Sequence, residues 1–214
     1  MNNHSEIDTP DRIKERLGER SPTRIWIAGN PEILKTERAT AVVGARNADR
    51  SLIKIAEKIG EAAAQSAHTL VSGAAKGIDE RAMLTTLETG GKSIGVIPGD
   101  LEREARSVRW RRWIEEGALT LITPYEPDGR FTVGKAMGRN RYIYCLADVA
   151  IALGAKRDSG GTWSGAKENL RKEWTPLYVE ETDDRTSGAN ALIELGARRL
   201  PQDIESLLIE WSKS

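Results

Sequence analysis

The sequence predicts an α/β protein, a Rossmann-like three-layer sandwich built around a mainly parallel sheet. Two observations support this prediction. Short apolar runs recur along the chain, and most are continuous rather than alternating, as in strands that are covered on both faces. Segments with the apolar spacing of amphipathic helices separate these runs, which is the pattern of repeated βαβ units.

The strands can be placed in order along the chain. Residues 1–22 are interpreted as a polar, mobile leader with a short helix over 11–17, and residues 23–214 as one domain. The run from Arg24 to Pro31 predicts a strand that ends in a turn. Further strands are expected at 40–43, 69–71, 93–97, 119–122, 149–153 and 177–179.

Helices are predicted in three of the segments between strands. One apolar face between the first two core strands is formed by Leu52, Ile55, Ala56, Ile59 and Ala63. Asp79 is predicted to cap a second helix, which runs through Leu87 and stops at the glycine pair 90–91. A third apolar stripe is formed by Trp163, Ala166, Leu170 and Trp174.

Composition limits the possible functions. The 32 lysines and arginines balance 32 aspartates and glutamates, so nucleic-acid binding would need a local basic patch. The single Cys145 excludes a disulfide within the chain and is expected to be a small buried apolar residue. With two histidines and no zinc-like spacing, no metal or other cofactor is expected. No apolar run approaches about 18 residues, so we expect a soluble cytoplasmic protein without membrane contact.

Three glycine- and arginine-containing motifs carry the functional signal. Two of them, GAR at 44–46 and SGAAKGID at 72–79, each follow a predicted strand and lead into a helical pattern. Loop amides and a helix N-terminus arranged in this way can bind phosphate. The third motif is RNR at 139–141. If all three meet at one sheet edge, they would form an anion site for a nucleotide or a nucleic-acid backbone.

Each motif also has a purely structural interpretation. Gly44 and Gly73 could simply permit tight turns between strand and helix. Asp79 is more readily a helix cap than a catalytic acid. Arg139 and Arg141 are placed at the start of a helix, where positive charge opposes the helix dipole; either a bound anion or an internal carboxylate partner would compensate this cost.

The densest basic run lies between Arg103 and Arg112. Basic residues beside Trp110 and Trp113 could follow a single strand and stack on its bases. Packing of the tryptophans in the core, under a solvated arginine face, is the favoured alternative.

Taken together, the motifs resemble the DNA-processing protein A (DprA/Smf) family over residues 25–200. Its loops correspond to residues 44–46 and 72–79, and its Arg-Asn-Arg motif is intact at 139–141. Its late Ser-Gly-Ser segment is echoed at 158–162, and its closing glycine-asparagine segment is complete over 188–197.

The resemblance implies a protein that binds single-stranded DNA, protects it and helps to load a RecA-type recombinase, without being an enzyme. It also implies a homodimer, formed here through residues 175–208. The DNA- and phosphate-binding residues carried over from the motifs are Gly44, Ala45, Arg46, Ser72, Gly73, Lys76, Gly77, Arg139, Asn140, Arg141, Ser159 and Gly160.

The sequence departs from the family pattern at several points. Met83 replaces a common histidine, and the acidic residue expected within 152–154 and the turn at 179–181 differ. Because the additional helical and winged-helix modules are not seen, we expect a stand-alone version with an accessory role in recombination, DNA uptake or mobile-element defence.

Two other functions stay open. Residues 159–162 and Glu168 loosely resemble the catalytic loop of Rossmann-like enzymes that hydrolyse nucleoside monophosphates. A phosphoribohydrolase or nucleotide sensor is therefore the alternative. An interaction protein with vestigial loops is disfavoured, because the charges in the turns are retained.

Overall fold

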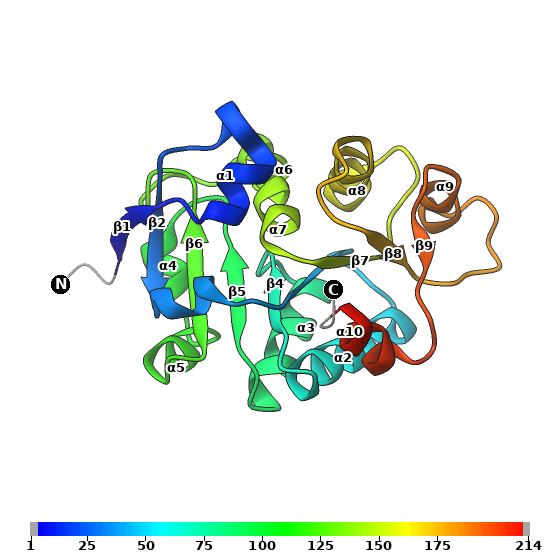
Figure 1. Cartoon of the computed structure of the whole chain (residues 1–214), viewed down its shortest axis with the longest axis horizontal. Coiled ribbons are helices and arrows are strands. Elements are labelled where there is room, and N and C mark those ends of the chain that lie inside the picture. Colours follow the sequence, from blue (N-terminus) through cyan, green and yellow to red (C-terminus); the bar gives the residue numbers. More distant parts are fainter. Residues whose placement is uncertain (1–3, 212–214) are drawn as a thin grey trace.

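The structure is a computed structural model that describes residues 4–211. Within that range, nine strands form one sheet in the order β1-β2-β6-β5-β4-β3-β7-β8-β9 (Figure 1). All pairings from β6 to β9 are parallel, which confirms the predicted fold class. The parallel strands are β3 (Ala39–Gly44), β4 (Thr69–Ser72), β5 (Ser93–Val96), β6 (Leu119–Thr123), β7 (Val149–Leu153), β8 (Leu177–Val179) and β9 (Arg198–Arg199).

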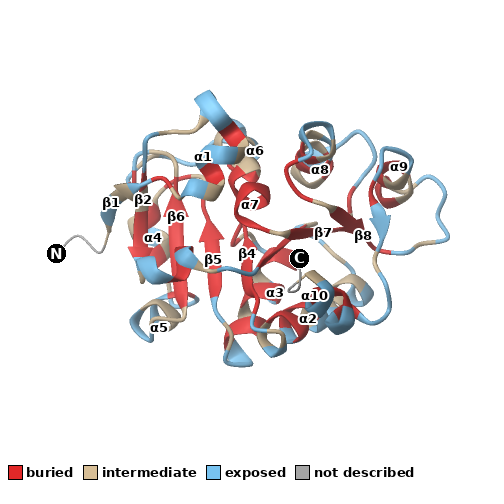
Figure 2. Ribbon diagram, viewed as in Figure 1, coloured by how far each residue is buried: buried red, intermediate tan, exposed pale blue. Residues whose placement is uncertain are grey.

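The predicted core strands are confirmed to within about one residue at each end, because continuous apolar runs suit strands buried on both faces. All six residues of β3 except the terminal Gly44 are buried. Successive side chains of β3 point to opposite faces of the sheet, so that Val43 belongs to the hydrophobic core on one face and Val42 to the core on the other. Figure 2 shows the central strands, β3 to β8, as the most buried layer of the molecule.

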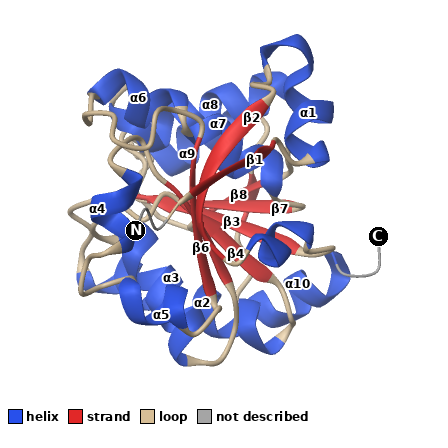
Figure 3. Cartoon of the chain, turned by 90° about the vertical axis from the view of Figure 1, so that its left-hand side faces the viewer, coloured by secondary structure: helices blue, strands red, loops and turns tan. Residues whose placement is uncertain are grey.

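Helices cover both faces of the sheet, which gives the predicted three layers (Figure 3). One face carries α2 (Arg50–Gln65), α3 (Ile78–Glu88), α4 (Leu101–Ala105), α5 (Arg111–Glu115) and α10 (Ile204–Trp211). The other face carries α1 (Asp11–Leu17), α6 (Val133–Gly138), α7 (Asn140–Leu146), α8 (Gly160–Lys172) and α9 (Gly188–Glu194). The short 3₁₀ turns are η1 (Gly18–Arg20) and η2 (Pro31–Lys35).

The expectation of a mobile leader over residues 1–22 differs from what the structure shows for residues 4–22. β1 (Ser5–Asp8) pairs antiparallel with β2 (Arg24–Gly29), which pairs antiparallel with β6. The predicted helix is α1, and its Ile13 and Leu17 are buried in the core. Together with the partly buried Ile7, these apolar side chains join the segment to the domain, although most of its other residues are polar.

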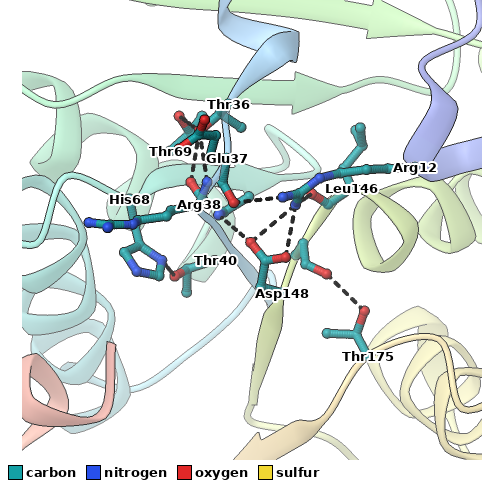
Figure 4. Close-up of polar contacts among 12 residues, drawn as sticks. Arg12, Thr36, Glu37, Arg38, Thr40, His68, Thr69, Leu146, Asp148 and Thr175 are labelled. Atoms are coloured by element: carbon teal, nitrogen blue, oxygen red, sulfur yellow. Dashed lines mark hydrogen bonds and ion pairs between the residues drawn. The ribbon is translucent and has the colours of Figure 1, made fainter. Parts of the chain in front are cut away.

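Arg12 and Arg16 of α1 fix this helix to the amino edge of the parallel strands, and Figure 4 shows the contacts of Arg12. Arg12 makes an ion pair of 3.0 Å with Asp148, at the start of β7, and donates to the Glu37 carbonyl at 2.7 Å. Asp148 also accepts the backbone N–H of Ala39 at 2.8 Å, so one carboxylate joins α1, β3 and β7. Arg16 donates to the carbonyl groups at the end of α7.

Two composition-based expectations are tested by the fold. Cys145 is fully buried in α7, and burial raises the pKa of its thiol to about 12, as expected for a small apolar residue. Within residues 4–211, none of the helices combines the length and the apolar character that a membrane crossing requires.

Candidate nucleic-acid interface

The candidate site lies in the middle of the sheet, where the connections after two neighbouring strands lead to helices on opposite faces. β3 is followed by α2 on one face, and its neighbour β7 is followed by α8 on the other. Their carboxyl ends lie side by side, since Gly44 pairs with Leu153. In open α/β sheets, ligands bind in the crevice outside such a switch point.

A cleft of about 450 Å³ occupies this position. Its walls come from the loops after β3 and β7, from the segment 131–140 and from the beginning of α8. Seven of the residues predicted from the sequence line it: Gly44, Ala45, Arg46, Arg139, Asn140, Ser159 and Gly160. The structure therefore brings together residues from three separated motifs.

The other five predicted residues do not line the cleft, and most of them have local structural roles. The Ser72 hydroxyl donates to the Val42 carbonyl at 2.6 Å, and Gly73 lies against the Arg139 side chain. Gly77 has a φ of 97°, and a Cβ there would lie 2.5 Å from the Ala45 carbonyl oxygen. Lys76 is exposed on the loop between β4 and α3.

Arg141 turns away from the cleft toward α8. Its guanidinium is 3.7 Å from the carboxylate of Glu168. Glu168 is the residue that loosely matched a hydrolase glutamate, and it is not among the cleft-lining residues. The two side chains form an ion pair between α7 and α8.

Asp79 is not the helix cap that the sequence predicted, since α3 begins at Ile78 after Gly77. The Asp79 side chain, in the first turn, instead reaches across to two other strand ends. It accepts the backbone N–H of Gly44 at 2.9 Å and that of Gly73 at 3.2 Å. Burial raises its pKa, and the nearby Arg139 and these N–H groups oppose that shift.

Of the two partners that the sequence allowed for Arg139, a bound anion or an internal carboxylate, the structure contains the carboxylate, that of Asp79. The Arg139 guanidinium lies 3.9 Å from Asp79 and donates to the Gly73 carbonyl at 3.0 Å. The residue is only 5% exposed. Burial lowers the pKa of Arg139 and Asp79 opposes this effect, although an arginine keeps its charge throughout the ordinary pH range.

Arg46 and Lys156 are exposed residues that line the cleft, and they supply positive charge that a ligand in the cleft can reach. The N-terminus of α8 adds a further anion-attracting group. Ser159 precedes this 13-residue helix without making a side-chain cap, so the first N–H groups of α8 stay free of a capping side chain. Gly160, Gly161 and Thr162 of that first turn line the cleft.

The rim of the cleft is apolar and was missed by sequence reasoning. Phe131, Val133 and Met137 line the cleft and are 54%, 68% and 42% exposed. The Arg46 guanidinium lies 5.9 Å from the centre of the Phe131 ring. Phe131 is the one phenylalanine of the chain and lies shortly before the RNR motif. This position near a motif was the signal in the sequence that could have identified it.

Lys156 was missed as well, because it belongs to no recognised motif. The signal that could have found it is its place three residues after the end of a buried parallel strand, β7. The loop that carries it turns sharply, since the Ser159 N–H donates to the Lys156 carbonyl at 3.1 Å. This turn places Lys156 beside the start of α8.

The basic run between Arg103 and Arg112 lies away from the cleft. Trp110 is fully buried, and the neighbouring arginines pair with glutamates. The nitrogen–oxygen distances are 3.1 Å for Arg109–Glu80, 3.8 Å for Arg111–Glu115 and 2.7 Å for Arg112–Glu116. The buried Trp110 and these ion pairs support the packing interpretation. Arg111 and Arg112 belong to α5, which leads into the amino end of β6, whereas Arg109 contacts the first turn of α3.

No group of three or more histidine, cysteine, aspartate or glutamate side chains that could hold a metal ion occurs within residues 4–211. The cationic side chains that line the cleft are Arg46, Arg139 and Lys156, beside the carboxylate of Asp79 and the backbone N–H groups of α8. Such donors suit a phosphate-containing ligand.

The fold and the cleft define a Rossmann-like α/β protein with a cationic, apolar-rimmed cleft at the switch point of its sheet. A family model described as DNA recombination-mediator protein A matches residues 3–212, and the chain belongs to that family. The resemblance seen in the motifs is thereby confirmed.

Curated relatives agree with this assignment. The chain is 31% identical over 182 residues to DNA processing protein DprA of Streptococcus pneumoniae, covering 83% of this chain and 63% of that protein. A relative in Mycobacterium tuberculosis is 27% identical, and 46% of its length is covered. The chain thus spans less than two thirds of the length of these curated relatives.

Solved structures share the fold. DNA processing protein A from Helicobacter pylori, studied for its binding of single-stranded DNA, superimposes with a TM-score of 0.83 at 24% identity, covering 98% of this chain and 96% of that one. DprA from S. pneumoniae gives 0.78 at 25% identity, covering 95% and 73%. A molybdenum cofactor binding protein from Rippkaea orientalis gives 0.60 at 20% identity, covering 84% and 99%.

Proposed function

We propose that this chain binds single-stranded DNA in the switch-point cleft without sequence specificity and without catalysing a reaction on it. One observation carries the proposal: Arg46, Lys156 and the uncapped N-terminus of α8 converge on a cleft whose rim carries an exposed phenylalanine. Cations and helix N–H groups bind phosphates, and an exposed ring offers a stacking surface for bases.

Several features favour a single strand over a duplex. Bases in a duplex face one another and cannot stack on Phe131, whereas those of a flexible strand can turn toward the apolar rim. The cations and the helix N-terminus at the cleft bind phosphates, which are the same in every nucleotide, and this suits binding without sequence readout. Lys76, exposed on the loop after β4, extends the positive charge beyond the cleft.

The family relationship supports a role with a recombinase. The matching model describes a recombination mediator, and the Helicobacter pylori relative is described as binding single-stranded DNA. We therefore extend the proposal to protection of strands and assistance to a RecA-type recombinase, in the cytoplasm where both would be found.

Self-association through residues 175–208 belongs to the same proposal. Of the apolar residues in that segment, Leu192, Ile204, Leu207 and Leu208 are buried within the chain, whereas Leu195 is 49% exposed. The surface left for a partner is consequently small. Light scattering at tens of micromolar protein would detect a dimer, and a monomer there would contradict this part.

The binding proposal is tested by fluorescence anisotropy with a labelled thymidine oligonucleotide and with a duplex. We expect the single strand to bind more tightly, with a log–log salt slope of about −0.7 for each phosphate neutralised. Arg46→Ala and Lys156→Ala should each weaken binding by about 1–3 kcal/mol.

Matched controls are available at the opposite edge of the sheet. Arg111→Ala and Lys92→Ala remove the same kinds of charge from exposed residues away from the cleft and should leave binding unchanged. Equal affinity for duplex, or loss of binding in these controls alone, would contradict the proposal. Release of free base from a nucleoside monophosphate would instead favour the hydrolase alternative.

A further inference from the structure

The three sequence motifs are joined in the wall of the cleft by one carboxylate, of Asp79, and one guanidinium, of Arg139. The Asp79 side chain is 6% exposed, and its two oxygens accept separate N–H groups, from Gly44 at 2.9 Å and Gly73 at 3.2 Å. These glycines follow the apolar runs of β3 and β4. Asp79 therefore fixes the spacing between two neighbouring strand ends.

Arg139 connects the third motif to the same point. Its side chain, also 6% exposed, donates to the Gly73 carbonyl and lies 3.9 Å from Asp79. A Cβ on Gly73 would come within 1.9 Å, 2.0 Å and 2.2 Å of three guanidinium atoms. The guanidinium thus lies directly against the Gly73 backbone, which only a glycine permits.

The charge of Arg139 is consequently engaged inside the protein. Its Nε and Nη1 atoms have no hydrogen-bond partner, yet both are closed off from solvent. Arg139 borders the cleft, but with the side chain 6% exposed its guanidinium offers a phosphate little accessible surface. Arg46 and Lys156, in contrast, are exposed residues of the cleft wall.

We propose that Asp79 and Arg139 are positioning residues, which hold the Gly44 and Gly73 loops in place while Arg46, Lys156 and the start of α8 contact the phosphates. This inference rests on the proposed binding of single-stranded DNA. It separates the arginines of the motifs into two kinds, one that contacts DNA and one that shapes the site.

The salt dependence of binding distinguishes the two kinds. Arg139→Gln keeps a donor for the Gly73 carbonyl but leaves Asp79 as an uncompensated buried charge, so affinity should fall about tenfold or more. Its log–log salt slope should equal that of the unaltered protein, because no phosphate contact is lost. Arg46→Ala should lower affinity and also reduce the slope by about 0.7.

Two further variants test positioning directly. Asp79→Asn combined with Arg139→Gln removes both buried charges and should recover much of the affinity lost in the single variant, since no charge is left unpaired. Gly73→Ala retains every charge but displaces the guanidinium, and it should weaken binding at an unchanged slope. A reduced slope for Arg139→Gln without recovery in the double variant would show direct phosphate contact and overturn the inference.

A measurement without DNA separates this inference from the proposed function. Amide hydrogen exchange should show protected N–H groups at Gly44 and Gly73, and Asp79→Asn should accelerate exchange at both, whereas Arg46→Ala should not. Unchanged exchange would overturn the inference. Failure of the unaltered protein to bind the oligonucleotide would instead contradict the proposed function and leave the exchange result to decide the positioning role.

Discussion

Glu180, at the end of β8, illustrates how much a single buried residue can control. Its Oε1 accepts the backbone N–H of Gly154 at 2.9 Å, while its Oε2 is buried without a partner. Gly154 opens the loop that carries Lys156 into the cleft. Burial raises the pKa of Glu180 above the ordinary value of 4.5, and the charge of Asp49 adds to this effect.

We predict that Glu180→Gln changes how stability depends on pH. A carboxyl whose pKa is raised by folding binds more protons in the folded than in the unfolded chain, so it adds stability as the pH falls through that window. The unaltered protein should therefore gain free energy of unfolding relative to Glu180→Gln between pH 7 and about pH 4.5. Urea denaturation at several pH values measures this, and parallel pH profiles would contradict it.

The residue scale also shows what sequence could and could not predict of the site. Arg46 was predicted because it belongs to a short glycine-containing motif between a buried strand and a helix, where loops that bind phosphate are found. The roles of Asp79 and Arg139 could not be derived, since a charge at a helix start is equally compatible with a bound anion and with a distant carboxylate. Lys156 and Phe131 belong to no motif, and only the three-dimensional fold places them beside Arg46.

At the scale of the element, the end of α2 shows a local conflict between sequence and conformation. The His68 N–H donates to the Ala63 carbonyl at 2.8 Å, and the Ala67 N–H donates to the Ala64 carbonyl at 3.2 Å. This is a Schellman motif, in which glycine is usual at the left-handed residue. Here that residue is Ala67, with a φ of 55°.

We predict that Ala67→Gly stabilises the protein by about 1 kcal/mol, because a Cβ is unfavourable in the left-handed region. Ala67 is exposed, so no buried methyl group is lost. Ala64→Gly, one turn earlier within the helix, serves as the control and should destabilise by about 1 kcal/mol. Thermal unfolding measures both, and a loss of stability in Ala67→Gly would disprove the prediction.

Elements differ in how well the sequence predicts them. β3, β4 and β7 were located because fully buried strands produce continuous apolar runs. The residues of β1 are mostly exposed, so its sequence carries no such run, and its strand conformation depends on pairing with β2. α6 has no buried residues at all, and it could not be inferred from apolar spacing.

At the scale of the whole molecule, α1 connects parts of the chain that are far apart in sequence. Arg12 bonds to Glu37, Leu146 and Asp148, and Asp148 in turn holds the start of β3 (Figure 4). This cluster lies at the edge of the sheet opposite the cleft. It therefore contributes to stability without touching the proposed DNA path.

We predict that Arg12→Ala lowers the free energy of unfolding by about 2 kcal/mol, because several charge-assisted hydrogen bonds are lost together. Lys14→Ala removes only an exposed ion pair of 3.3 Å with Asp11 and should have little effect. Chemical denaturation compares the two. Equal effects of both variants would show that α1 is held by its apolar side chains alone.

The pairing of β3 also determines the order in which the protein can be built. Thr40 of β3 lies between Leu70 of β4 and Val149 of β7, so its two neighbours are synthesised at very different times. One edge of this buried strand stays open until β7 has left the ribosome, and such long-range pairing slows folding and exposes the chain to aggregation. The walls of the cleft come from both sides of that late pairing. A nascent chain therefore cannot form the cleft until β7 and the start of α8 have been synthesised.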